Sequence, residues 1–149
     1  MTHVEISIDI DRPPAEVFAF ISNFENNPRW QSGMVAAKFT SEGPLAVDST
    51  YVQISKFLGR RIESSFEVIE YEPNKMVKAR TTASSFPIQF MRSVEPLGDG
   101  TRVKAVIEGE ARGFFKLAGP LLDPMVQRQI EADYANLKRI LEAEIRSNS

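Results

Sequence analysis

Short turn sequences separate a series of alternating segments between residues 34 and 110, and this spacing constrains the fold more than any other feature. Apolar and polar residues alternate within each segment, which is typical of a half-buried β-strand. The turns, such as Gly43-Pro44 and Gly98-Asp99-Gly100, are too short for the crossover that parallel neighbours need. The segments therefore predict an antiparallel meander with strands at residues 34–41, 49–57, 61–71, 76–83, 87–95 and 101–110.

The N-terminal region predicts a further strand and two short helices. Residues 4–10 alternate strictly between apolar and polar side chains, as a half-buried strand requires. Pro13-Pro14 then ends the strand and favours the first turn of a helix that runs to about Ser22. A second turn or short helix ends near Trp30.

A long amphipathic helix is predicted at the end of the chain, from about Leu121 to Arg146, and it would be about 39 Å long. Its apolar stripe consists of Leu122, Val126, Ile130, Leu137, Ile140 and Leu141. The inner face of the meander is the one large apolar surface on which this stripe can be buried. We therefore predict an α+β fold, in which a seven-stranded antiparallel sheet curls round the C-terminal helix.

Composition limits the classes of function. The 149 residues fit a single domain, 1–149, and the net charge of −2 without a basic run argues against binding to nucleic acid or anionic lipid. No segment resembles a membrane span or a signal peptide, so we expect a soluble, cytoplasmic protein. With no Cys and one His, the sequence predicts neither a metal site nor a cofactor, and it leaves the oligomeric state open.

The order of these elements resembles the helix-grip fold of the START-like superfamily, also called SRPBCC. The resemblance covers nearly the whole chain, and its local motifs lie at residues 10–18, 27–30, 98–103, 113–122 and 137–142. Residues 112–122 are most similar to the polyketide cyclase/dehydrase and lipid transport branch. The resemblance implies an elongated apolar cavity between sheet and helix that holds lipids, sterols or polyketides. It implies no single reaction, because the superfamily includes carriers, sensors, cyclases and dehydratases.

Polar residues at positions where the pattern predicts inward-facing side chains are the candidate functional residues. Asp133 lies between Ile130 and Leu137 on the helix stripe. A buried carboxylate there needs a partner, a raised pKa or a water-filled cavity, because an uncompensated charge would cost several kcal/mol. The alternative is that Asp133 lies at the edge of the stripe and reaches solvent.

Arg92 is the second candidate, because it shares strand parity with Phe90 and Val94. An inward guanidinium could meet Asp133, or it could bind a carboxylate, enolate or phosphate of a ligand. The alternative is a β-bulge that turns Arg92 outward.

Several further residues are weaker candidates. Ser64 and Gln129 could orient a ligand through hydrogen bonds, although filler or solvated roles are the simpler interpretation. Five phenylalanines are candidate cavity walls, with plain core packing as the alternative: Phe66, Phe86, Phe90, Phe114 and Phe115. Trp30 is expected to pack beside the second short helix, away from any ligand.

Three functions remain open at this stage. The first is binding of a small hydrophobic molecule in the cavity, as a carrier or sensor. The second is an enzyme of the cyclase or dehydratase type, with Asp133 as the general acid or base and Arg92 stabilising an oxyanion. The third is an interaction domain whose cavity is filled by the phenylalanine side chains.

Overall fold

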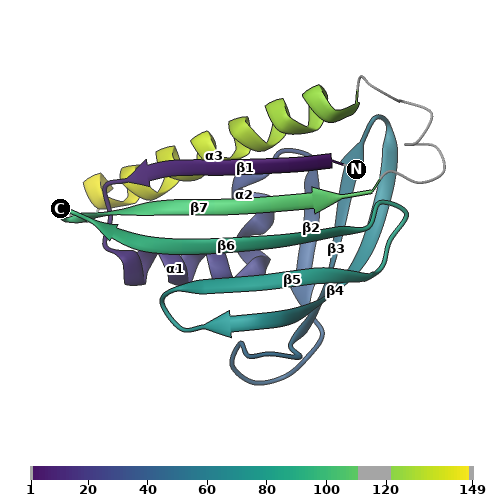
Figure 1. Ribbon diagram of the computed structural model, residues 1–149, viewed down its shortest axis with the longest axis horizontal. Coiled ribbons are helices and arrows are strands. Elements are labelled where there is room, and N and C mark those ends of the chain that lie inside the picture. The colour runs from purple at the N-terminus through teal and green to yellow at the C-terminus, as the bar shows by residue number, and fades with distance from the viewer. Residues whose placement is uncertain (1, 111–121, 148–149) are drawn as a thin grey trace.

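A curved antiparallel sheet forms the larger layer of the protein (Figure 1). The computed structural model describes residues 2–110 and 122–147. The sheet order is β1-β7-β6-β5-β4-β3-β2, so that the meander strands are neighbours in sequence order and β1 closes onto β7. The strands are β1 (Thr2–Ile10), β2 (Met34–Phe39), β3 (Thr50–Phe57), β4 (Arg60–Glu72), β5 (Met76–Ala83), β6 (Ile88–Leu97) and β7 (Gly100–Gly109).

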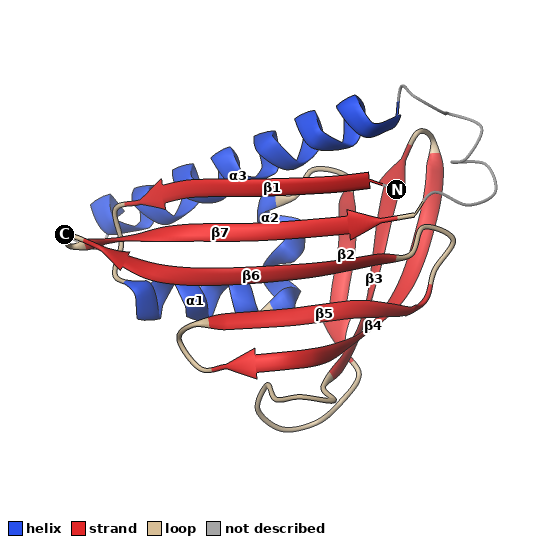
Figure 2. Ribbon diagram, in the orientation of Figure 1, coloured by secondary structure: helices blue, strands red, loops and turns tan. Residues whose placement is uncertain are grey.

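The sheet bends along β4. Its pairing with β5 shifts register between Ser65 and Phe66 and again between Val68 and Glu70. Such irregularities increase the local twist and re-aim the strand. As a result β2, β3 and the first part of β4 run steeply across the direction of the remaining strands, and the sheet acquires a concave face (Figure 2).

Three short helical segments cover part of this sheet: α1 (Pro14–Ser22), the 3₁₀ helix η1 (Phe24–Asn26) and α2 (Asn27–Trp30). Pro14 stands at the first helical position of α1, where its missing N–H costs no hydrogen bond. Val17 and Ile21 lie one turn apart and are both fully buried. Helix α1 thus packs on β6 and β7 and fills one end of the concave face.

Helix α3 (Leu122–Ser147) runs beside β1 and completes the second layer (Figure 2). Its buried apolar side chains are those of Tyr134, Leu137 and Leu141. Side chains between residues 123 and 132 are exposed or only half-buried. The apolar stripe therefore packs most closely in the second half of the helix.

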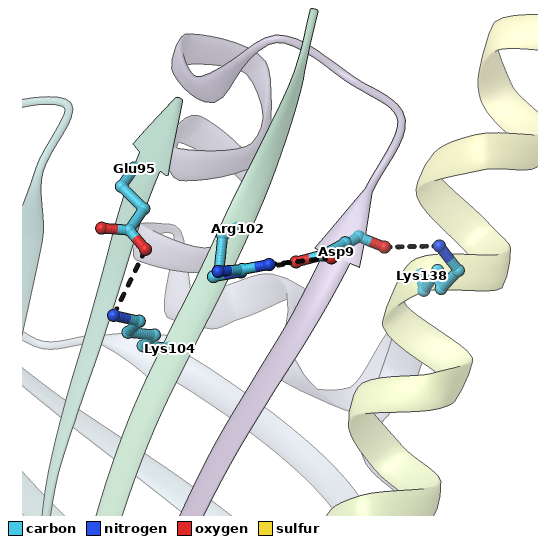
Figure 3. A network of polar contacts seen from close by, with 5 residues as sticks. All are labelled: Asp9, Glu95, Arg102, Lys104 and Lys138. Carbon is cyan, nitrogen blue, oxygen red and sulfur yellow. Dashed lines mark hydrogen bonds and ion pairs between the residues drawn. The ribbon is translucent and has the colours of Figure 1, made fainter. Parts of the chain in front are cut away.

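Polar contacts secure that second half of α3 to the sheet (Figure 3). Lys138 donates a hydrogen bond from Nζ to the backbone carbonyl of Asp9 on β1. The Asp9 carboxylate in turn accepts a hydrogen bond of 2.9 Å from Nε of Arg102 on β7. This contact, with the charge of Arg102, holds the pKa of Asp9 below its usual value. Lys104 and Glu95 form a further cross-strand ion pair at 3.2 Å.

The predicted helix-grip architecture is confirmed: a seven-stranded sheet curls round a C-terminal helix, and two short α-helices follow the first strand. Element bounds differ from the predicted ones by one or two residues. Strand β2, for example, ends at Phe39 rather than at residue 41. No helix in the described ranges is both long and apolar enough to cross a membrane.

Candidate functional site: a two-chamber cavity under the sheet

A cavity with two adjoining chambers lies between the concave face of the sheet and α3. The inner chamber has a volume of about 120 Å³ and the outer chamber about 200 Å³. Both are lined by the same six residues where they meet: Gln31, Gln53, Ile88, Ile107, Ile130 and Asp133. Together the chambers reach the lower end of the range usual for small-molecule sites. The interior is therefore not completely filled by the protein's own side chains.

Arg92 is the central charged residue of the inner chamber. Its side chain points inward, with only 5% of its surface exposed. Nη1 donates hydrogen bonds to the carbonyl oxygen of Ile21 at 2.9 Å and to Oδ1 of Asn27 at 3.1 Å. The guanidinium carbon also lies 4.9 Å from the ring centre of Trp30 and 4.8 Å from that of Phe90. Neutral oxygens and aromatic faces thus stabilise this cation.

A contact between Arg92 and Asp133, one of the possibilities that the sequence left open, is not formed. No ion pair joins these two described residues, although both line the inner chamber. Asp133 instead accepts hydrogen bonds of 3.0 Å at Oδ1 from the backbone N–H and from the hydroxyl of Ser32. The chain between α2 and β2 therefore supplies the partner that sequence reasoning sought in Arg92.

Burial raises the pKa of Asp133 above its usual value, against an opposing effect of the hydrogen bonds from Ser32 and Gln129. Gln129 completes the arrangement, because its Nε2 also donates to the carbonyl oxygen of Ser32 at 3.0 Å. Asp133 is 7% exposed and borders both chambers. It is thus a partly desolvated carboxyl group within reach of a bound molecule.

Three buried donors around the inner chamber have no hydrogen-bond partner within the described part of the chain: Nε of Arg92, Nε1 of Trp30 and Nε2 of Gln31. All three residues line the chamber. A buried donor without a partner is destabilising, and an acceptor brought into the chamber would relieve that cost. The inner chamber is therefore suited to a group that carries oxygen acceptors.

The outer chamber exposes mostly apolar surface, although polar side chains such as Lys56, Gln129 and Asp133 also line it. Phe66 is 1% exposed and belongs to the aromatic core, where its ring stacks on Tyr51 at a centroid distance of 4.8 Å. Ser64 interrupts this lining, but its hydroxyl is already hydrogen-bonded to that of Ser84 at 2.7 Å. The apolar lining consists of Met34, Phe57, Ile62, Phe66, Phe86, Ile88, Ile107, Val126 and Ile130.

The structure places most of the predicted site residues at this cavity. Arg92 and Phe90 line the inner chamber, while Ser64, Phe66, Phe86 and Gln129 line the outer one. Asp133 lines both chambers. Phe114 and Phe115 lie outside the described residues.

Trp30, which was expected to pack away from any ligand, lines the inner chamber. Helix α2 is a single turn that contacts α3. The indole of Trp30 therefore packs edge-on against the ring of Tyr134, with 4.9 Å between the ring centres, and borders the inner chamber.

Sequence reasoning missed several further polar lining residues. Gln53 shares strand parity with the buried Tyr51, so the rule that identified Arg92 would also have found it. Tyr134 lies about 60° from Leu137 on the helical wheel and was detectable in the same way. Asn27 gave no such signal, because an Asn before Pro indicates a turn and says nothing about burial. Among the described residues, no cluster of His, Cys, Asp and Glu could hold a metal ion.

The sequence matches the family described as polyketide cyclase / dehydrase and lipid transport over residues 1–142. The chain belongs to this family. Among solved structures, the Thermus thermophilus protein TTHA0849 superposes with a TM-score of 0.80 at 18% identity, covering 95% of this chain and 98% of that one. This member of the polyketide cyclase and lipid transport family thus shares its fold with proteins of low sequence identity.

Two further structures carry more descriptive names. A START superfamily protein from Mycobacterium smegmatis has a TM-score of 0.75 at 16% identity and full coverage of both chains. The ZhuI aromatase/cyclase from Streptomyces sp. R1128 has a TM-score of 0.78 at 13% identity, covering 99% of this chain and 97% of that one. These similarities establish the START-like fold. No curated protein matched the sequence.

Proposed function

We propose that this member of the polyketide cyclase and lipid transport family binds a small hydrophobic molecule, lipid-, sterol- or polyketide-like, as a carrier or sensor. The observation that carries the proposal is the division of the cavity into an apolar outer chamber and a donor-rich inner one. The guest's apolar body would occupy the outer chamber, and an oxygen-bearing end would reach Arg92 and Trp30. Burial of about 300 Å² of apolar surface would contribute about 7 kcal/mol before entropic losses.

A cavity-blocking substitution tests this proposal. Ile107 on β7 lies where the two chambers meet, so Ile107→Trp should fill the junction. The affinity for a fluorescent fatty-acid probe should then fall about tenfold or more. The neighbouring Val106 has the opposite strand parity, and Val106→Trp adds the same bulk on the other face. Equal probe binding by the two variants, each with a cooperative thermal transition, would exclude this cavity as the binding site.

A ligand series tests the orientation of the guest without altering the protein. Dodecanoate, 2-tridecanone and dodecylamine have similar apolar bodies but differ at the polar end. The carboxylate and the ketone offer acceptors to the buried donors, whereas the ammonium ion brings a second cation beside Arg92. We expect the amine to bind at least about tenfold more weakly than the ketone. Indifference to the head group would contradict the proposed orientation.

An enzymatic function of the cyclase or dehydratase type is the second candidate. It is favoured by one observation: Asp133 borders the cavity with a raised pKa and is not paired with Arg92, whose charge would otherwise weaken it as a base. Arg92 would stabilise an enolate in this mechanism. The test is turnover of a polyketide-like substrate, which Asp133→Asn should abolish while probe binding is retained. Unchanged turnover in Asp133→Asn would exclude Asp133 as the acid or base.

A further inference from the structure

The hairpin between β3 and β4 has an unusual turn. Its two central residues, Leu58 and Gly59, have φ angles of 52° and 76°. Two positive φ angles in a two-residue loop define a type I′ turn, whose first position favours Asn, Asp or Gly. A leucine in this conformation is destabilising. The turn thus keeps an apolar side chain at a position whose backbone conformation favours Asn, Asp or Gly.

The strands leading into this turn carry a second unfavourable feature. Lys56 and Arg61 are directly paired across β3 and β4, and both side chains are exposed. Like charges directly opposite each other on a sheet repel. Glu63 is the nearest acidic residue on β4, but none of the described ion pairs joins it to either cation. The Lys56–Arg61 pair is therefore a local concentration of positive charge.

This hairpin, residues 56–61, which we call the basic hairpin, lies at the rim of the outer chamber. Lys56 and Phe57 belong to the chamber lining. Phe57 and Leu58 pack beside Ile62 and Phe86, which also line the chamber. Figure 1 shows the β3–β4 hairpin near the first turn of α3, at the opposite end of the molecule from the β4–β5 turn. Features that cost stability thus coincide with the rim of the outer chamber.

We infer that the basic hairpin docks the protein on an anionic membrane surface, from which the cavity takes or releases its guest. It holds the exposed cations Lys56 and Arg61 directly opposite each other, although the whole chain has a net charge of −2. Two bulky apolar residues lie between the cations, which matches the boundary between lipid headgroups and acyl chains. An acidic protein would explain the charge but not the apolar residues at the turn. The overall charge balance conceals this local cluster.

Sedimentation with vesicles tests the inference. We expect the protein to sediment with vesicles of phosphatidylcholine containing phosphatidylglycerol, but not with phosphatidylcholine alone, and to dissociate in high salt. Arg61→Glu should weaken binding about 30-fold, because it reverses one charge at the membrane surface. Lys75→Glu makes the same change in the β4–β5 turn and should have little effect.

Leu58→Asn separates folding from docking. Asn is favoured at this turn position, which offsets the loss of the contact between Leu58 and Ile62, so the variant should unfold at close to the wild-type temperature. It should nevertheless bind anionic vesicles several-fold more weakly, because an apolar contact with the acyl chains is lost. A wild type that does not sediment, or an equal loss in Arg61→Glu and Lys75→Glu, would overturn the inference.

The inference rests on the proposed function in one respect: the molecule exchanged at the membrane is the guest of the cavity. Probe binding in solution should be unchanged in Arg61→Glu. Failure of vesicle docking with intact probe binding would therefore reject the basic hairpin alone, while failure of probe binding would reject the cavity function.

Discussion

Arg92 brings a full positive charge into the interior, and its neighbours explain how the fold accommodates it. A backbone carbonyl and the Asn27 amide accept two of its hydrogen bonds, and the rings of Trp30 and Phe90 lie against the guanidinium. None of these groups is anionic, so the charge is solvated rather than neutralised. The guanidinium therefore retains its attraction for an acceptor on a guest.

Asp133 should make stability depend on pH in a defined direction. Burial raises its pKa in the folded state, so the folded protein holds this proton more tightly than the unfolded chain. Stability from this group is present below the unfolded-state pKa of about 4 and is lost as pH rises through the folded-state value. At pH 7 Asp133→Asn should therefore be more stable than the wild type in urea denaturation.

Acid titration supplies the control for this prediction. The two proteins should converge in stability below about pH 4, where the wild-type carboxyl is protonated in both states. Asp99→Asn, which removes a carboxyl group in the exposed β6–β7 turn, is the matched control variant. A variant that is less stable than the wild type at neutral pH would mean that the bonds to Ser32 outweigh burial.

At the scale of residues, the sequence pattern predicted which way the side chains of Arg92 and Asp133 point, but not the groups that they contact. Strand and helix periodicity place Arg92 and Asp133 inward, as observed. Their hydrogen-bond partners lie on α1, α2 and the segment that follows, about 65 to 101 residues away in sequence. Periodicity within one element carries no information about such contacts.

At the scale of elements, Gly33 sets the start of β2. Its φ of +82° is unfavourable for other residues, and a Cβ there would lie 2.8 Å from the carbonyl oxygen of Lys56. Its own carbonyl accepts a 2.7 Å hydrogen bond from the Lys56 N–H. We expect Gly33→Ala to destabilise the fold by about 2–3 kcal/mol in urea denaturation, because strain and a backbone clash combine.

Gly43 provides a matched control. Its φ is +85°, but a Cβ there would meet nothing within 4 Å. Gly43→Ala should therefore cost only the conformational strain, about 1 kcal/mol. Equal losses in the two variants would show that the segment around Gly33 relaxes away from Lys56.

The elements themselves were largely predictable, because strict alternation and turn residues mark the strands. The end of β2 was not. The N–H groups of Thr40 and Ser41 both donate to the carbonyl of Thr50, at 2.9 and 3.3 Å, so the regular ladder stops at Phe39 although alternation continues. The register shifts in β4, which produce the curvature, likewise left no clear pattern in the sequence.

At the scale of the molecule, the solid core and the cavity should respond differently to truncation. Leu137 is fully buried, so Leu137→Ala should cost about 3 kcal/mol in urea denaturation. Ile130 is only half-buried and borders both chambers, so Ile130→Ala should cost about 1 kcal/mol. Similar losses for both variants would mean that the chambers are closed in solution.

The unequal attachment of α3 has a consequence for selectivity. Its second half is secured to the chain around β1, where Lys138 binds the Asp9 carbonyl and Glu142 accepts a 2.9 Å hydrogen bond from the Asp11 N–H. The first half, which borders the outer chamber, carries fewer buried side chains. Widening of the cavity to admit a larger molecule therefore costs the least free energy at the first half of α3. We therefore expect the protein to discriminate strictly between guest molecules that differ in the polar group entering the inner chamber. It should tolerate guests with longer or branched apolar tails.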